Sequence, residues 1–162
     1  RKIFWGLNCV FDLDPCSPGA DHWVPAKHVY TEAHDGLLHK WFGMVWLNNP
    51  WTGRLTQVPW LEKFIEHGNG IGICAAYTSS DWFQRYIFGQ MDMVCFPTGR
   101  IAFLRPGEIR GSGAGLECAM YAKGRRACKI LKASNLGWCV AHPSKMMPAS
   151  ITRSIQLAKV RV

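Results

Sequence analysis

The segment from residue 42 to residue 51 constrains the fold most. It reads Phe-Gly-Met-Val-Trp-Leu-Asn-Asn-Pro-Trp, an apolar run that stops at two amides, a proline and an aromatic residue. The apolar part predicts a strand buried on both faces, as in a parallel sheet covered by helices. Pro50 removes a backbone donor and favours an extended conformation at Asn49, so we expect both amides at the carboxyl end of the strand. Ligands bind at this edge of open α/β sheets.

The residues at this strand end suit chemistry on a planar amine. The side-chain oxygen of Asn48 and a loop carbonyl could accept the two hydrogens of an exocyclic amino group, while Trp51 stacks on the ring that carries it. The alternative interpretation is an ordinary strand-to-turn junction, in which Asn and Pro end the strand.

Segments typical of strands and helices alternate around this stretch. We expect further strands at 10–14, 29–31, 70–77, 91–96 and 116–122. We expect helices at 59–67, opened by Pro59 and closed by Gly68, at 82–88 after the cap candidates 78–81, and at 123–132. The alternation predicts a layered α/β fold, with a β-hairpin that starts at 97–105. We expect one domain over residues 1–138 and an extension of unassigned structure over 139–162.

The composition fits a globular protein with a polyanionic partner. The 162 residues are 48% hydrophobic and 19% charged, and the formal net charge is +8. Such an excess of cations favours nucleic acid as a partner, although a merely basic protein has the same composition. No apolar run reaches the roughly 18 residues that a membrane span needs. The chain begins at Arg1 without Met, as a fragment of a longer protein would.

The cysteines and histidines indicate neither a disulfide framework nor a metal site. The seven cysteines are scattered, with no Cys-x-x-Cys pair, which is typical of a reduced, cytoplasmic protein. The histidines at 22, 28, 34 and 39 match neither a helical i, i+4 pair nor a zinc-finger spacing. We therefore expect no bound metal.

Two carboxylates and a glycine-rich segment complete the set of candidate residues. Asp14 ends the first expected strand before Pro15 and could hold the charged amine of a cofactor, or simply begin a turn. Asp35 supplies a second carboxylate before the central strand. The glycine-rich segment 107–115, beside Arg105 and Arg110, could approach a phosphate backbone or serve as a flexible connection.

Several of these motifs occur in the order found in the phage-encoded DNA adenine methyltransferases, the Dam-like family that the chain resembles. The resemblance covers about residues 4 to 138. It rests on 11–16 (Phe-Asp-Leu-Asp-Pro-Cys), 30–32 (Tyr-Thr-Glu), 35–37 (Asp-Gly-Leu), 45–51 (Val-Trp-Leu-Asn-Asn-Pro-Trp), 53–54 (Gly-Arg), 60–63 (Trp-Leu-Glu-Lys), 78–83 (Thr-Ser-Ser-Asp-Trp-Phe) and 99–103 (Gly-Arg-Ile-Ala-Phe).

The resemblance implies a Rossmann-like sheet with helices on both faces and a C-terminal β-hairpin. It implies methyl transfer from S-adenosylmethionine to the N6 amine of adenine in DNA. The cofactor residues would be Asp14, Pro15, Cys16, Tyr30, Thr31, Asp35 and Gly36. The catalytic residues would be Asn48, Asn49, Pro50 and Trp51. Contacts to DNA are expected from Arg54, Arg100, Arg105 and Arg110.

Asn49 departs from the family pattern, which has a proline at this position. A backbone carbonyl remains there, but the fixed backbone angle that aims it is lost. Two alternatives therefore stand beside adenine methylation. One is methylation of the N4 amine of cytosine, and the other is a catalytically impaired DNA-binding protein on the same scaffold.

Overall fold

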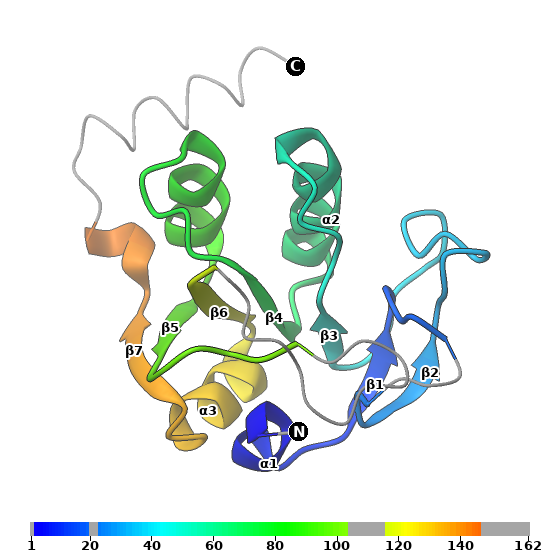
Figure 1. Ribbon diagram of the computed structural model, residues 1–162, viewed down its shortest axis with the longest axis horizontal. Coiled ribbons are helices and arrows are strands. Elements are labelled where there is room, and N and C mark those ends of the chain that lie inside the picture. The colour runs from blue at the N-terminus through cyan, green and yellow to red at the C-terminus, as the bar shows by residue number, and fades with distance from the viewer. Residues whose placement is uncertain (1, 20–22, 104–115, 147–162) are drawn as a thin grey trace.

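A mixed sheet of seven strands lies at the centre of the molecule (Figure 1). The computed structural model describes residues 2–19, 23–103 and 116–146. The elements in chain order are α1 (Lys2–Leu7), β1 (Phe11–Asp14), β2 (Ala26–Val29), β3 (Val45–Leu47), α2 (Arg54–His67), β4 (Gly70–Ala75), the π-helical η1 (Phe83–Phe88), β5 (Met93–Pro97), β6 (Cys118–Lys123), α3 (Arg125–Ala133), β7 (Gly137–Ala141) and the 3₁₀-helical η2 (Pro143–Met146).

The sheet has a parallel part and an antiparallel part. The strand order is β2-β1-β3-β4-β6-β5-β7. β2, β1, β3 and β4 run parallel to one another, whereas β6, β5 and β7 pair antiparallel to their neighbours. From β1 the chain goes first to β2 on one side and then to β3 on the other. β1 is therefore the point where the strand order reverses.

The central strands are apolar on both faces because helices cover both faces of the sheet. Every residue of β3 and of β4 is buried, as the continuous apolar runs predict. α2 and η1 lie on one face, and α1 and α3 lie on the other (Figure 1). Two separate clusters form the core, one containing Leu61, Phe64, Phe83 and Tyr121 and the other containing Leu7, Trp46, Ala127 and Leu131. The predicted α/β layering is confirmed.

Several predicted boundaries are wrong. β2 covers 26–29, earlier than the expected strand at 29–31. α2 begins at Arg54, so Pro59 lies inside the helix instead of opening it. A proline there removes one backbone hydrogen bond, and the buried side chains of Leu61 and Phe64 offset this loss. Gly68 ends α2 in the left-handed conformation with φ 76°, as expected.

The helix expected at 82–88 is present, but it is a π-helix. Gly89 N donates a hydrogen bond to Gln84 O, five residues back, instead of four as in an α-helix. Ser80 supplies the expected cap, because its Oγ accepts a hydrogen bond from Phe83 N at 3.4 Å.

The C-terminal part differs most from the prediction. β6 is not the last strand, since β7 pairs antiparallel with β5 at the edge of the sheet. The boundary expected between residues 138 and 139 falls inside β7. The hairpin arm expected at 97–105 is not a strand over its described part, because β5 ends at Pro97 and residues 98–103 hold only an isolated bridge at Ala102. β5 itself pairs antiparallel with β6, and residues 104–115 lie outside the described ranges. The sequence did not predict α1. All seven cysteines are free thiols.

A buried tyrosine gives a test of this core. Tyr121 is fully buried beside Phe64, and among the described residues its hydroxyl has no hydrogen-bond partner. Tyr121→Phe removes an unpaired polar group, so we expect the free energy of unfolding in urea to rise by about 1 kcal/mol. Tyr86→Phe is the matched control, because Tyr86 Oη donates a hydrogen bond to Glu62 at 2.8 Å. Loss of this bond is expected to lower the free energy of unfolding. Destabilisation by Tyr121→Phe would contradict this description of the core.

Candidate ligand-binding cleft

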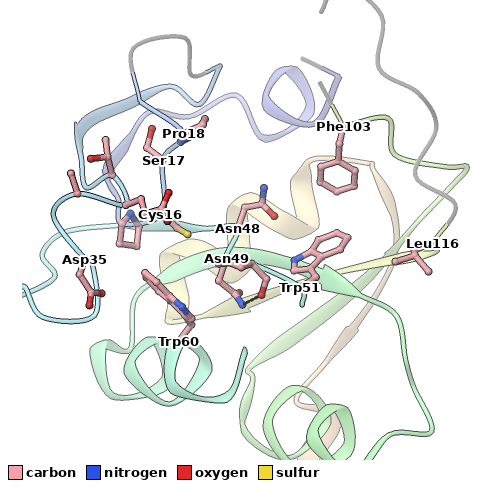
Figure 2. Close-up of a pocket in the computed structure, with 16 residues that line it drawn as sticks. Cys16, Ser17, Pro18, Asp35, Asn48, Asn49, Trp51, Trp60, Phe103 and Leu116 are labelled. Atoms are coloured by element: carbon pink, nitrogen blue, oxygen red, sulfur yellow. Dashed lines mark hydrogen bonds between the residues drawn. The ribbon is translucent and has the colours of Figure 1, made fainter. Parts of the chain in front are cut away.

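A cleft opens at the carboxyl ends of β1, β2 and β3 (Figure 2). Its volume is about 1400 Å³, above the roughly 300–1,000 Å³ typical of one small-molecule site. It is lined by Pro15, Cys16, Ser17, Pro18, Thr31, Glu32, Ala33, Asp35, Gly36, Asn48, Asn49, Pro50, Trp51, Trp60, Phe103 and Leu116. We call it the strand-end cleft. It lies where the strand order reverses, which is the usual ligand site of open α/β sheets.

The strand-end cleft brings together residues that are far apart in the sequence. All the predicted catalytic residues line it, and so do all the predicted cofactor residues except Asp14 and Tyr30. The Tyr30 hydroxyl instead donates to the carbonyl of Lys40 at 3.2 Å. Three loops after three parallel strands therefore form one site.

Asp14 lies behind the cleft and organises the loop after β1. Its side chain is buried, with 2% exposure, and Oδ1 accepts a hydrogen bond from Cys16 N at 3.0 Å. Burial raises the pKa of Asp14 to about 6, although the hydrogen bond from Cys16 N favours the charged form. Burial and the neighbouring Asp14 raise the pKa of Cys16 to about 12, so this thiol is not a nucleophile at neutral pH.

The loop after β2 packs directly against the loop after β1. Gly36 lies so close to the carbonyl of Pro15 that a Cβ atom at Gly36 would overlap it. The Gly36 carbonyl accepts a hydrogen bond from Trp41 Nε1 at 2.8 Å. Asp35 has φ 52°, and its Oδ1 accepts from Leu37 N at 3.1 Å. Gly36 thus brings Asp35 to the wall of the cleft.

The two amides after β3 have different environments. Asn48 is partly exposed, and Figure 2 shows its amide pointing between Ser17 and Phe103. Asn49 is only 3% exposed, and its Nδ2 donates to the carbonyl of Pro50 at 3.1 Å. Among the described residues, Asn49 Oδ1 has no hydrogen-bond partner. Asn48 is therefore the amide that a ligand in the cleft could reach.

Aromatic side chains form much of the wall. The Trp51 ring meets Phe103 edge to face, with 5.0 Å between ring centroids. Trp60 comes from α2 and lies on the same side as Cys16 and Asp35 (Figure 2). The sequence placed Trp60 on the apolar face of a helix, and Trp60 and Phe103 also belong to the segments 60–63 and 99–103 of the family resemblance. Neither they nor Leu116 were among the predicted site residues.

The charged side chains among the described lining residues of the cleft are all acidic. Glu32 and Asp35 line it, whereas no Lys or Arg occurs among its described lining residues. Glu32 belongs to the Tyr-Thr-Glu motif but was not among the predicted site residues. A negative cleft favours a cationic or neutral ligand and disfavours a phosphate.

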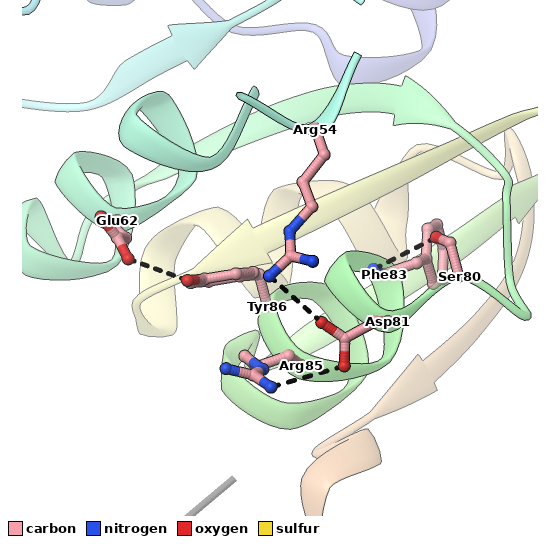
Figure 3. Close-up of polar contacts among 7 residues, drawn as sticks. All are labelled: Arg54, Glu62, Ser80, Asp81, Phe83, Arg85 and Tyr86. Carbon is pink, nitrogen blue, oxygen red and sulfur yellow. Dashed lines mark hydrogen bonds and ion pairs between the residues drawn. The ribbon is translucent and has the colours of Figure 1, made fainter. Parts of the chain in front are cut away.

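Two of the four arginines expected to contact DNA, Arg54 and Arg100, are not among the described residues that line the cleft. Arg54 and Arg85 both pair with Asp81, at 3.5 and 3.4 Å (Figure 3). Arg100 pairs with Glu117 at 3.5 Å. Exposed pairs of this kind are weak, so a polyanion could displace the carboxylates. Arg105 and Arg110 lie outside the described residues.

Within residues 2–19, 23–103 and 116–146, no group of three His, Cys, Asp or Glu side chains is arranged to hold a metal ion. In the same ranges no helix is long and apolar enough to cross a membrane. Comparison of the chain with protein-family models, curated proteins and solved structures finds no match.

The raised pKa of Asp14 predicts a pH-dependent stability. The folded pKa of about 6 lies above the unfolded value of about 3.9, so the native state binds more protons between these pH values. The free energy of unfolding therefore falls as the pH rises through this window and stays lower above pH 6.

Asp14→Asn removes this titration and can keep the hydrogen bond from Cys16 N. We expect the variant to be about 2 kcal/mol more stable than the parent chain at pH 8, with little difference below pH 4. Urea unfolding at several pH values measures this. If the difference in free energy of unfolding between Asp14→Asn and the parent chain does not vary with pH, the carboxyl group of Asp14 is not buried as described.

Proposed function

We propose that this chain transfers a methyl group from S-adenosylmethionine to the N6 amine of adenine in DNA. One observation carries the proposal. The segments that the sequence assigns separately to the cofactor and to catalysis converge on the strand-end cleft, at the carboxyl ends of β1, β2 and β3. The reversal of strand order at β1 supports a Rossmann-like ligand site there.

The cleft suits this cofactor in size and charge. S-adenosylmethionine carries a sulfonium and an ammonium group, and Glu32 and Asp35 are the only charged side chains among the described lining residues. Trp60 offers an aromatic surface on the same side as Asp35. The volume of about 1400 Å³ leaves room for a second planar ligand beside the cofactor. When bound, the cofactor would supply an electrophilic methyl group.

The other end of the cleft suits a planar base with an exocyclic amine. Asn48 Oδ1 and the carbonyl of Asn49 would accept the two amine hydrogens, which leaves the lone pair of the nitrogen directed at the methyl donor. Trp51 would stack on the base. A base inside a duplex cannot reach such a site, so it would have to be extruded from the stack. The phosphates would stay outside, since the described lining residues include no cation.

The chain contributes to the reaction by orientation and by exclusion of water. Asn48 fixes the amine, and the apolar rings of Trp51 and Phe103 cover one side of the site. Asp14 acts behind the wall, because it holds the backbone of Cys16 in place. The same arrangement would accept the N4 amine of cytosine, since it contacts the amine and not the rest of the base.

The environment of Asn49 favours a second candidate, a DNA-binding protein with impaired catalysis. The side-chain amide of Asn49 points into the protein, where its Nδ2 donates a hydrogen bond to the carbonyl of Pro50. Asn49 also lacks the fixed backbone angle of a proline. If the Asn49 carbonyl is misaligned, the transfer rate falls by as much as about 100-fold. This candidate predicts salt-dependent DNA binding without methyl transfer.

Methyl transfer can be tested with labelled S-adenosylmethionine and DNA of mixed sequence. We expect label in DNA that nucleoside analysis identifies as N6-methyladenine, whereas N4-methylcytosine would indicate the alternative target. Asn48→Ala should lower kcat by about 100-fold or more, because it removes the acceptor that orients the amine.

The matched control for this test is Asn135→Gly. Asn135 is exposed and has φ 52°, which glycine adopts without strain, so the variant loses an amide and should keep full activity. Absence of methyl transfer with every DNA tested would refute the enzymatic proposal. DNA binding in that case would support the second candidate.

A further inference from the structure

A second hollow lies at the opposite edge of the parallel strands. Its volume is about 700 Å³, and it is lined by Phe4, Trp5, Asn8, Cys9, Val10, Trp23 and Pro25. These residues come from α1 and from the segments that precede β1 and β2. β1 has four residues, so about 13 Å of strand separates this hollow from the strand-end cleft. We call it the amino-edge hollow.

The amino-edge hollow exposes large apolar side chains. Trp5 is 84% exposed, Val10 is 55% exposed and Trp23 is 42% exposed. Lys2 is exposed three residues before Trp5, which places both side chains on the same side of α1. Exposed apolar side chains that adjoin one another are more typical of an interaction site than of a surface that contacts only water.

A row of cations lies on α3, the helix that neighbours α1. α3 packs against α1, and its solvent face carries Arg125, Arg126, Lys129 and Lys132. All four are exposed, and among the described residues none forms an ion pair with a carboxylate. By contrast, Arg54 and Arg100 each have a carboxylate partner.

Arg126 connects the cations to the hollow. Burial raises the pKa of Cys9, a lining residue, and the positive charge of Arg126 opposes that increase, so Arg126 lies within electrostatic range of the hollow. The nearby carboxylate of Asp12 is already occupied, because it accepts hydrogen bonds from Lys27 Nζ and from Met44 N, each at 2.8 Å. The charge of Arg126 also lowers the pKa of Asp12, but among the described residues Arg126 forms no ion pair, which leaves its guanidinium accessible to an anion.

We propose that the amino-edge hollow binds single-stranded nucleic acid. A base would stack on the Trp5 indole, and the adjoining phosphates would meet Arg126 and the other cations of α3. Exposed aromatic rings along a positive surface bind single strands because every base has a stacking face. A duplex hides these faces, so a single strand fits the exposed indole better than a duplex. This site requires neither the cofactor nor the proposed methyl transfer.

The test uses a dye-labelled single strand of twelve thymidines, dT12, and fluorescence anisotropy at low salt. Thymine has no exocyclic amine, so the result does not depend on the proposed catalytic site. We expect Trp5→Ala to weaken binding about tenfold, and Trp5→Phe to keep most of the affinity. Arg126→Gln should weaken binding and reduce the slope of log affinity against log salt by about 0.7.

Trp138→Ala is the matched control, because Trp138 on β7 is 82% exposed and lies outside the hollow. It should bind dT12 as the parent chain does. Trp5 is so exposed that Trp5→Ala should fold normally, which circular dichroism checks. The proposal is overturned if dT12 does not bind, or if Trp5→Ala and Arg126→Gln leave its binding unchanged. It is also overturned if Trp138→Ala weakens dT12 binding as much as Trp5→Ala does, or if the dA12·dT12 duplex binds more tightly than dT12.

Discussion

The carboxylate of Asp12 holds together the strands on which the rest of the site depends. Asp12 lies on β1, its Oδ1 accepts from Lys27 on β2, and its Oδ2 accepts from Met44 N just before β3. These bonds and the attraction of Lys27 lower the pKa of Asp12, so the group stays ionised at neutral pH. The backbone pairing of β1 with β2 and β3 sets where the three strands end, and Asp12 adds a side-chain contact to each neighbour. The strand-end cleft is formed by the loops that start at those ends.

The strand-end cleft and the solvent face of α3 carry opposite charges. The described lining of the strand-end cleft has two carboxylates, Glu32 and Asp35, and no cation. α3 follows β6 in the antiparallel part, and its solvent face has four cations and no carboxylate. This separation explains how a chain with a net charge of +8 can offer a negative cleft. A cationic cofactor and a polyanion could then bind the same chain at different surfaces.

The sequence predicts those parts of the fold that depend on local patterns. β3 and β4 were found because their continuous apolar runs leave no other arrangement than a covered sheet. The sequence assigned Asp35 to a binding site only through the family resemblance. Its convergence with Asn48 agrees with a general property of parallel strands, whose carboxyl ends meet at one edge. Trp60 and Phe103 were missed because tertiary packing, and not a local motif, brings them to the cleft. α1 and β7 are short and lie at the ends of the described chain, and their sequences gave no cap or alternation to detect them.

The most direct test of this account is calorimetric titration of S-adenosylmethionine into the parent chain and into Asp35→Asn. The variant removes a charge from the cleft wall, and Asp81→Asn is its control, since Asp81 pairs with Arg54 and Arg85 away from the cleft. The account predicts binding of one cofactor per chain, about tenfold weaker in Asp35→Asn and unchanged in Asp81→Asn. No binding by the parent chain, with or without DNA, or equal binding by both variants would contradict it.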